Sequence, residues 1–256
     1  VKVNGKLNNH LKYIDALKIY AKSKCELQRC IELVEMFSKD INMSLGIDKC
    51  GIVNVKKGKL DDEKFKSEIP TLTFNESYKY LGMCESSNIL HKEMKEKATK
   101  EMFRRVKAIA KAKLTATNFA KAYNSFALPI LRYGFGILKW TKTELLQLDR
   151  KMRKILTKAG FHHPKSNTHR LYMRRTDGGR GVKSLWDPHT AECSKIATYL
   201  RKHKRGDPLT NLIADMEMKK PKTVNILRFK DDEVSLVNKH AEEHLEKYKE
   251  MEMHGQ

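Results

Sequence analysis

The sequence predicts an α+β fold in which a small mixed subdomain, built of antiparallel strands and a helix, precedes a basic, all-helical region. Two observations predict this order. Short runs rich in Tyr, Ile and Val alternate with Gly- or Asp-containing turns in the first third of the 256 residues. From about residue 88, apolar residues recur at helical spacing instead, and Lys and Arg crowd the intervening positions. We place the seam between the two parts near residue 85.

Local patterns predict each element of the first part. Tyr and Ile flank a central Asp15-Ala16 in residues 11–21, which indicates a hairpin. Apolar residues at helical spacing predict a helix over 25–43, closed by Gly46. The remaining expectations are a strand at 50–55, an exposed turn at 56–59, a polar surface loop at 60–76 and a short strand at 78–83.

Caps and helix breakers divide the second part. A helix starts near 88, and a second covers 117–138 with a kink at Pro129. A third is capped by Thr143 and ended by Gly160. The remaining expectations are a glycine-containing loop at 161–182, a helix from Asp187-Pro188 to about 204, and a last charged, peripheral helix at 231–253.

Composition narrows the class of protein. Apolar residues make up 40% of the chain, enough for one sizeable core or two small ones. Five cysteines are an odd number and too few for a disulfide framework, which favours a reducing, intracellular compartment. No run of apolar residues approaches the roughly 18 that a spanning helix needs, so we expect no membrane partner.

The positive charge is concentrated in the middle of the chain. Lys and Arg exceed Asp and Glu by 21 overall, and residues 86–206 alone hold 29 Lys and Arg against 8 Asp and Glu, while the two flanks cancel. A block this one-sided indicates a polyanionic partner, with nucleic acid first. An anionic membrane surface fits less well, because no Trp- or Phe-rich amphipathic face accompanies the basic residues.

Several short motifs follow one another along the chain. They are Tyr13-Ile-Asp15, Gly46-Ile-Asp-Lys-Cys50, Tyr78-Lys-Tyr-Leu-Gly82, Ala127-Leu-Pro-Ile-Leu-Arg-Tyr-Gly134, Leu148-Asp-Arg-Lys-Met-Arg-Lys154, His162-His-Pro-Lys165, Arg170-Leu-Tyr172 and Gly178-Gly-Arg-Gly181. Together they resemble the reverse transcriptases of non-LTR retrotransposons. The resemblance implies a partial palm at 1–85, thumb-like helices at 86–160, a basic loop and helix extension at 161–206, a charged helical tail at 207–256, and residence in the nucleus.

The resemblance also implies a degenerate catalytic site. Two-metal phosphoryl transfer needs carboxylates that hold both Mg²⁺ ions about 4 Å apart. The family has a Tyr-x-Asp-Asp hairpin and a further Asp on an earlier strand. Here the hairpin has Ala16 in the second Asp position, and the earlier strand is not among these residues. Asp15 is then a remnant metal ligand, or simply a turn residue, and we expect no active two-metal Mg²⁺ site.

Two further sites follow from the resemblance alone. Lys49 matches a lysine that lies near the triphosphate, although an ordinary exposed lysine fits better without the missing partners. Tyr80, Leu81 and Gly82 match the hairpin that grips the primer end, the alternative being an ordinary strand and turn.

We expect the basic helices to retain nucleic-acid binding, because Lys and Arg contact phosphates without recognising the base sequence. The candidates are Lys95, Lys100, Arg104, Arg105 and Lys111 in the first helix, Arg150, Arg153 and Lys154 in the third, and Arg174, Arg175 and Arg180 in the loop. Gly178, Gly179 and Gly181 either let the backbone approach a phosphate or form a plain turn.

The sequence therefore favours one function and leaves others open. The favoured one is a fragment of an RNA-directed DNA polymerase that binds an RNA template, an RNA–DNA hybrid or duplex DNA through its thumb and is inactive alone. One alternative is a host-retained RNA- or DNA-binding module. Another is an interaction protein whose basic face docks an acidic partner, and a relic with an open sheet edge is the last.

Overall fold

The computed structural model divides the chain into two units, Val1–Met94 and Lys95–Gln256. The boundary falls later than the seam expected near residue 85. The structure describes the whole chain except residues 1, 4–5, 8, 62, 64, 66, 74–75, 87, 204–205, 222–223, 231 and 254–256. Helices and two-stranded antiparallel sheets make up the described elements, so the mixed α+β class is confirmed.

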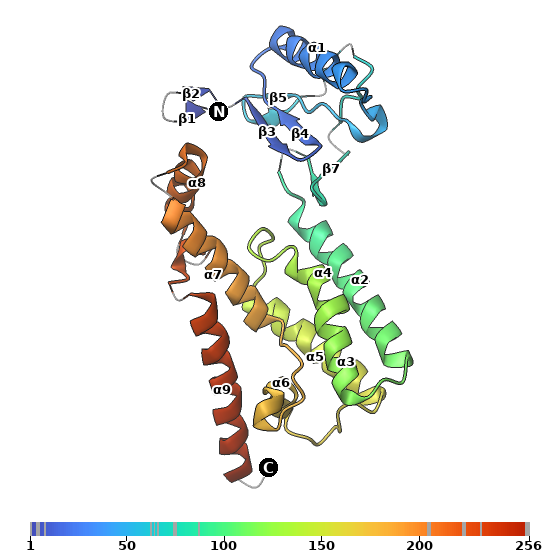
Figure 1. Ribbon diagram of the computed structural model, residues 1–256, viewed down its shortest axis with the longest axis vertical. Coiled ribbons are helices and arrows are strands. Elements are labelled where there is room, and N and C mark those ends of the chain that lie inside the picture. The colour runs from blue at the N-terminus through green and yellow to red at the C-terminus, as the bar shows by residue number, and fades with distance from the viewer. Residues whose placement is uncertain are drawn as a thin grey trace. The chain divides into compact units, whose positions relative to one another are not determined.

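Unit 1 combines short hairpins with one long helix (Figure 1). The strand pairs are β1 (Lys2–Val3) with β2 (Lys6–Leu7), β3 (His10–Tyr13) with β4 (Ala16–Ile19), β5 (Val55–Lys56) with β6 (Lys59–Leu60), and β7 (Tyr78–Tyr80) with β8 (Met83–Glu85). The helices are α1 (Lys24–Asp40) and a 3₁₀ turn at Ile47–Lys49. The described strands stay in separate pairs and do not merge into a larger sheet.

The first predicted hairpin forms, with its turn one residue earlier than expected. Tyr13 pairs directly with Ala16, so Ile14 and Asp15 make the turn and Ala16 begins β4. Ile14 takes a left-handed φ of 53°, which a β-branched residue adopts only under constraint. Alternation of Tyr and Ile located the hairpin but could not fix this register.

Two other hairpins close on an Xaa-Gly turn. Lys57 and Gly58 have φ values of 51° and 77°, and Leu81 and Gly82 have 45° and 79°. Two consecutive positive φ values are typical of the two-residue turn that suits the twist of antiparallel strands, and glycine removes the cost at the second position. The exposed turn at 56–59 is therefore confirmed, while the strand expected at 78–83 is a hairpin.

The expected end of α1 at Gly46 is wrong. The helix ends at Asp40, and Asn42 takes the left-handed conformation instead, with a φ of 54°. The Met43 N–H then donates to the Ser38 carbonyl at 2.8 Å, which is the usual closing bond of a left-handed helix end. Asn serves here because its short polar side chain tolerates this conformation.

Unit 2 is built of helices (Figure 1). Its α-helices are α2 (His91–Lys111, whose first turn belongs to unit 1), α3 (Ala116–Ala122), α4 (Leu128–Arg132), α5 (Lys142–Lys158), α6 (Thr168–Tyr172), α7 (Trp186–His203), α8 (Pro208–Met218) and α9 (Glu233–Met253). A π turn at Tyr123–Ala127 joins α3 to α4, and 3₁₀ turns occupy Arg175–Asp177 and Ile226–Arg228.

The π turn marks the position where the sequence predicted a kink. The Leu128 N–H donates to the carbonyl of Tyr123, five residues back, just before Pro129. A proline ring clashes with the carbonyl four residues earlier in a regular α-helix, and the wider turn relieves this clash. The helix ends at Arg132, so the expected helical extension to 138 is wrong.

The ends of α5 are defined by local chemistry. Thr141 caps the helix rather than Thr143, because the Thr141 hydroxyl accepts from the Glu144 N–H while the Glu144 carboxylate accepts from the Thr141 N–H at 2.8 Å. The predicted end at Gly160 is confirmed by its φ of 77°. The inner face of the helix is buried in the core of the unit at Leu145, Leu148, Met152 and Leu156.

The C-terminal helices pack more than the sequence suggested. The helix expected from Asp187-Pro188 is present as α7, but it begins one residue earlier at Trp186, so Asp187 lies in its first turn. Helix α9 lies against α6 and α7 with Leu236 and His240 buried. His244 of α9 approaches the Asp187 carboxylate at 3.3 Å. The last helix therefore packs through Leu236 and His240 while most of its other side chains stay exposed, and α8 lies within the expected helical tail, where no separate helix had been placed.

Candidate nucleic-acid interface

A row of exposed cations lies on the outer face of α5. Arg150, Lys151, Lys154 and Lys158 are exposed and repeat at helical spacing opposite the buried leucines. We call these four residues the α5 cation stripe. None of the four forms an ion pair with another residue that the structure describes. Their charge therefore faces solvent.

The two acidic residues of α5 do not oppose this stripe. Glu144 binds the Lys95 ammonium at 2.8 Å. Asp149 is 1% exposed, and its two carboxylate oxygens accept from the Leu185 N–H at 3.0 and 3.2 Å. Burial raises the pKa of Asp149 to about 7, so its negative charge is largely suppressed below neutral pH. Residues 150–176 then contain nine Lys and Arg and no Asp or Glu.

The cations of α2 are arranged differently. Arg104 and Arg105 both bind the Glu101 carboxylate, with Nε–O distances of 2.7 and 2.9 Å. Hydrogen bonds from Arg104 and then Arg105 lower the pKa of Glu101 to about 2, so this carboxylate stays ionised. Lys100 and Lys111 are exposed on the same helix. Two of the five expected α2 contacts, Arg104 and Arg105, are therefore already paired.

Lys95 is an interior contact of unit 2. Its side chain is 16% exposed, and its ammonium binds Glu144 and lies 5.0 Å from the centre of the Trp140 ring. This pairing holds α2 against the start of α5. The expectation that Lys95 contacts phosphate does not fit this placement, because its charge is balanced inside the unit.

Arg153 and Arg174 also serve partly as structural contacts. Arg153 is half-buried and donates to the Tyr172 hydroxyl at 2.8 Å, which joins α5 to α6. Arg174 is exposed and donates to the Asn238 side chain of α9 at 2.6 Å. Arg175 and Arg180 are exposed.

The glycine loop offers no free amides to a phosphate. The N–H groups of residues 178–182 donate in turn to the carbonyls of Arg175, Arg174, Arg170, Met173 and Leu171, at 2.9 to 3.2 Å. A Cβ at Gly179 would lie 2.2 Å from the Met173 carbonyl oxygen, so two backbone segments meet there. The structure thus favours the plain turn over the phosphate-binding loop at Gly178, Gly179 and Gly181.

The catalytic remnants belong to unit 1. Asp15 is exposed in its turn and belongs to no group of three or more His, Cys, Asp or Glu side chains that could share a metal, within the described residues. One carboxylate beside Ala16 does not fit the donor set of a two-metal Mg²⁺ site. No chemical step through Mg²⁺ is therefore derived for this chain.

The other two remnants have local contacts. Lys49 is exposed, and its carbonyl accepts from the Tyr78 hydroxyl at 2.6 Å, which ties the 3₁₀ turn to β7. Tyr80, Leu81 and Gly82 form the end of β7 and its turn, with the Lys18 ammonium 5.2 Å from the Tyr80 ring centre. These contacts fit an ordinary hairpin and leave the primer-grip assignment a proposal.

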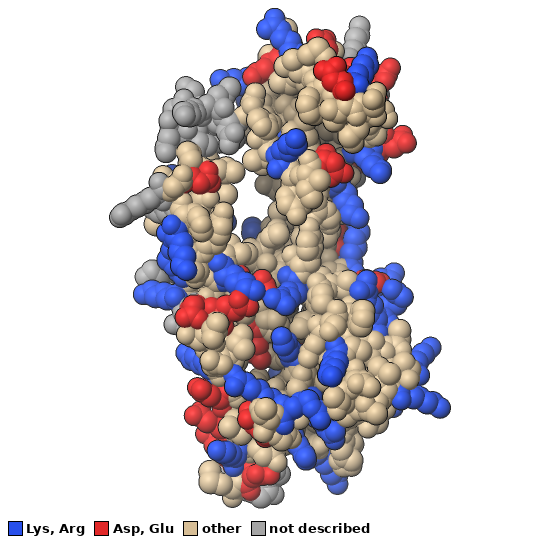
Figure 2. All heavy atoms as spheres, viewed as in Figure 1, with Lys and Arg blue, Asp and Glu red and all other residues tan. Residues whose placement is uncertain are grey.

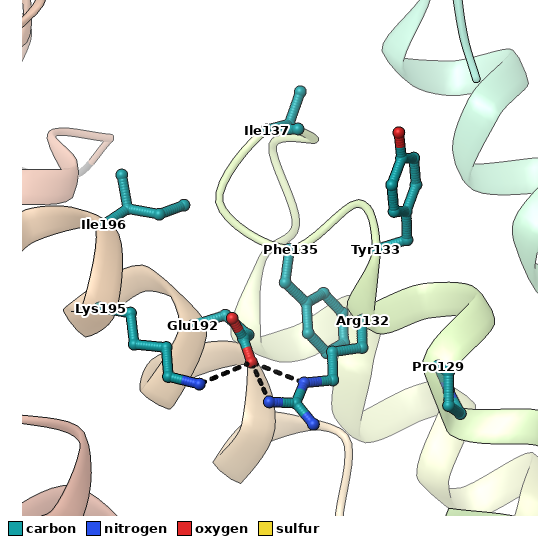
Figure 3. A pocket seen from close by; sticks show the side chains of 8 residues that line it. All are labelled: Pro129, Arg132, Tyr133, Phe135, Ile137, Glu192, Lys195 and Ile196. Atoms are coloured by element: carbon teal, nitrogen blue, oxygen red, sulfur yellow. Dashed lines mark hydrogen bonds and ion pairs between the residues drawn. The ribbon is translucent and has the colours of Figure 1, made fainter. Parts of the chain in front are cut away.

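One surface hollow of unit 2 lies between α4 and α7 (Figure 3). It measures about 490 Å³. The Glu192 carboxylate is shared between the Arg132 guanidinium and the Lys195 ammonium, and Phe135 and Ile196 contribute apolar wall. Because its cations are paired within it, this hollow is not part of the cation surface.

Basic side chains dominate the visible face of unit 2, whereas acidic ones gather toward α9 (Figure 2). Sequence reasoning missed Lys151 and Lys158 of the stripe, and the exposed Lys165 and Arg170 that follow it. Helical spacing predicts the two stripe lysines, because residues 150, 151, 154 and 158 share one helical face. Among the described residues, no helix is both long and apolar enough to cross a bilayer.

No known family model matches this chain, and no curated protein is detectably similar to it.

Proposed function

We propose that this protein binds nucleic acid through the α5 cation stripe. The observation that carries the proposal is an exposed row of four cations with no described carboxylate paired to it, on a chain with a net charge of +21. Lys and Arg that neutralise phosphates release counterions, which supplies affinity that does not depend on sequence. The exposed Arg175, Arg180, Lys165 and Arg170 extend the same positive region along the chain.

We also propose that the chain derives from a non-LTR retrotransposon reverse transcriptase and does not polymerise DNA alone. The order of these motifs along the chain supports the origin, and Ala16 beside Asp15 supports the loss of activity. In this proposal the helical unit retains the thumb's grip on a template–primer duplex, and a nuclear location follows from the origin. Binding and ancestry are separate claims, so they need separate tests.

Binding is tested by fluorescence anisotropy with an RNA–DNA hybrid, duplex DNA and single-stranded RNA across a salt series. We expect tight binding at low salt and a log–log slope of about −4, because four stripe cations each contribute roughly −0.9. A folded sample that binds none of the three probes at low salt overturns the proposal. Recovery of an acidic protein that nucleic acid cannot displace would support the interaction protein instead.

Ancestry and inactivity are tested by primer extension. We expect no templated synthesis in Mg²⁺ by this chain or by Ala16→Asp, because restoring one carboxylate leaves the third absent. Synthesis by the unaltered chain would contradict the inactivity. Synthesis by Ala16→Asp once an upstream palm half is supplied in trans would support the ancestry, and its failure with a folded complex would count against it.

A further inference from the structure

A second hollow of unit 2 lies at the C-terminal end of the α5 cation stripe. It measures about 390 Å³ and forms where the ends of α2 and α5 meet the start of α3. Its lining residues are Ala110, Lys113, Leu114, Ala116, Ala159, Gly160, Phe161 and Arg180. The volume falls within the range of small-molecule pockets, at roughly 300–1,000 Å³.

The lining of this hollow combines apolar side chains with two cations and includes one aromatic ring. Phe161 follows Gly160 directly, and its ring lies 4.1 Å from that of buried Phe119, centre to centre. This contact, together with the Phe161 N–H bond to the Leu156 carbonyl at 3.0 Å, fixes the ring after the helix end. Leu114 supplies an aliphatic surface in the same hollow. Such a wall suits a flat, weakly polar ring.

The charged residues that line the hollow are both cations. Lys113 and Arg180 are exposed and come from different segments, and no acidic side chain is among the lining residues. His162, next to Phe161, has its pKa lowered by burial and by nearby Arg153 and Arg180, which is a further sign of a positive local field. An aromatic and an aliphatic side chain beside two cations complement an aromatic base attached to a phosphate.

The hollow is continuous in sequence with the stripe. Lys158, the last stripe residue, precedes the lining residues Ala159, Gly160 and Phe161. A strand whose phosphates follow the stripe toward the end of α5 is therefore directed to the hollow. A paired base is buried in its own stack and cannot enter, whereas an unpaired base exposes its ring face.

We propose that this hollow binds one unpaired nucleotide at the end of the strand held on the α5 cation stripe, with its base against Phe161 and Leu114 and its phosphate between Lys113 and Arg180. The inference rests on the proposed nucleic-acid binding and adds a substrate preference to it. The protein then favours nucleic acid with an unpaired end over a blunt duplex.

The test compares two hybrids that differ by one nucleotide. One is a blunt RNA–DNA hybrid, and the other carries a single unpaired adenine at its 3′ end. We expect the second to bind the full chain about 10-fold more tightly, since stacking of one base on an aromatic side chain contributes enough for that factor. With 2-aminopurine as the unpaired base, its emission should change on binding.

Matched variants distinguish binding in the hollow from the general effect of positive charge on affinity. Lys113→Gln with Arg180→Gln should remove most of the preference, whereas Lys121→Gln with Lys139→Gln removes the same charge from exposed lysines elsewhere in unit 2 and should keep it. Phe161→Ala should abolish the 2-aminopurine change. Because Phe161 also contacts Phe119, the two-cation variant serves as the decisive one if Phe161→Ala does not fold.

The outcomes distinguish this inference from the proposed function. Equal, tight binding of both hybrids overturns the proposal that the hollow binds an unpaired nucleotide. It leaves the proposed nucleic-acid binding by the stripe in place. A preference that survives the Lys113 and Arg180 changes overturns it as well, because the unpaired base then binds elsewhere. Failure to bind either hybrid overturns both proposals.

Discussion

Helices α2 and α5 are both rich in Lys and Arg, but the charge that each presents to solvent differs. On α2 the Glu101 carboxylate holds Arg104 and Arg105, and exposed Glu93 and Glu96 add further negative charge. On α5 one acid is paired with a lysine of α2 and the other is buried. The formal charge of a helix is therefore a poor measure of the charge that a polyanion meets.

The difference arises from where each carboxylate points. Glu101 precedes Arg104 and Arg105 by three and four residues, so all three side chains share one helix face and form a charge-assisted pair. Asp149 lies on the inner face of α5, where it accepts from the Leu185 N–H at the entrance to α7. Its position serves packing and places its carboxylate away from the exposed face that holds the stripe.

The largest expected effect comes from removing the stripe. Arg150→Gln with Lys151→Gln and Lys154→Gln should weaken binding to an RNA–DNA hybrid by about 100-fold at 0.1 M salt and reduce the log–log slope by about 3. The matched change on α2, Arg104→Gln with Lys107→Gln and Lys111→Gln, should have a clearly smaller effect, because Arg104 is already paired. Anisotropy titrations across a salt series measure both.

The two triple variants should unfold at the same denaturant concentration as the unaltered chain, because the replaced residues are exposed. Circular dichroism with urea titration provides this control. Equal losses of affinity from the α2 and α5 variants would contradict the proposed difference between the two helices. A larger loss from the α2 variant would mean that α2 forms the interface.

Asp149 provides the next largest effect, on stability rather than affinity. Its folded-state pKa of about 7 lies above its unfolded value of about 3.9. The folded state therefore holds more protons between these values, and this residue's contribution to stability falls as pH rises through that window. Relative to Asp149→Asn, the unaltered chain should lose about 2 kcal/mol of unfolding free energy between pH 5 and pH 8.

Urea titrations of both proteins at several pH values measure this difference directly. Other titrating groups, including His189 with its pKa lowered to about 4 by burial, are present in both proteins and cancel in the comparison. An unchanged difference across the range would mean that Asp149 is ionised throughout. It would then add negative charge beneath the stripe.

Local chemistry made part of this architecture predictable. The end of α5 at Gly160 and the exposed face that holds Arg150 and Lys154 follow from glycine geometry and helical spacing. The missed helix α8 has the same signal that located α7, since Asp207-Pro208 repeats the Asp-Pro pattern and Asp207 caps the helix by accepting from the Thr210 N–H at 2.8 Å. Consistent use of the rule would have found it.

Other features depended on tertiary contacts. The partner of Lys95 is Glu144, far away in the sequence, so no local pattern predicts that this lysine is used internally. The burial of Asp149 likewise requires knowledge of how α7 starts. Gly179 is required by the nearby Met173 carbonyl, and the sequence alone left a phosphate loop equally open. The Glu101 pairs, by contrast, were readable from spacing alone.

The smallest effect should come from freeing the α2 arginines. Glu101→Gln removes the carboxylate that binds Arg104 and Arg105, so both guanidinium groups become available to phosphates. We expect binding to an RNA–DNA hybrid to tighten by about 3- to 10-fold and the log–log slope to steepen by about 1. Arg105 keeps its bond to the Phe126 carbonyl, which limits the gain from that side chain.

Glu96→Gln is the matched control for this change, because it removes the same charge from an exposed position of the same helix that does not hold the arginines. If both variants tighten binding equally, net charge alone explains the gain and the pairing at Glu101 has no special role. A gain confined to Glu101→Gln would show that carboxylate pairing keeps α2 the weaker of the two basic helices. The contrast with α5 would then depend on one side chain, since removing it frees Arg104 to join Lys100 and Lys111, which α2 already exposes.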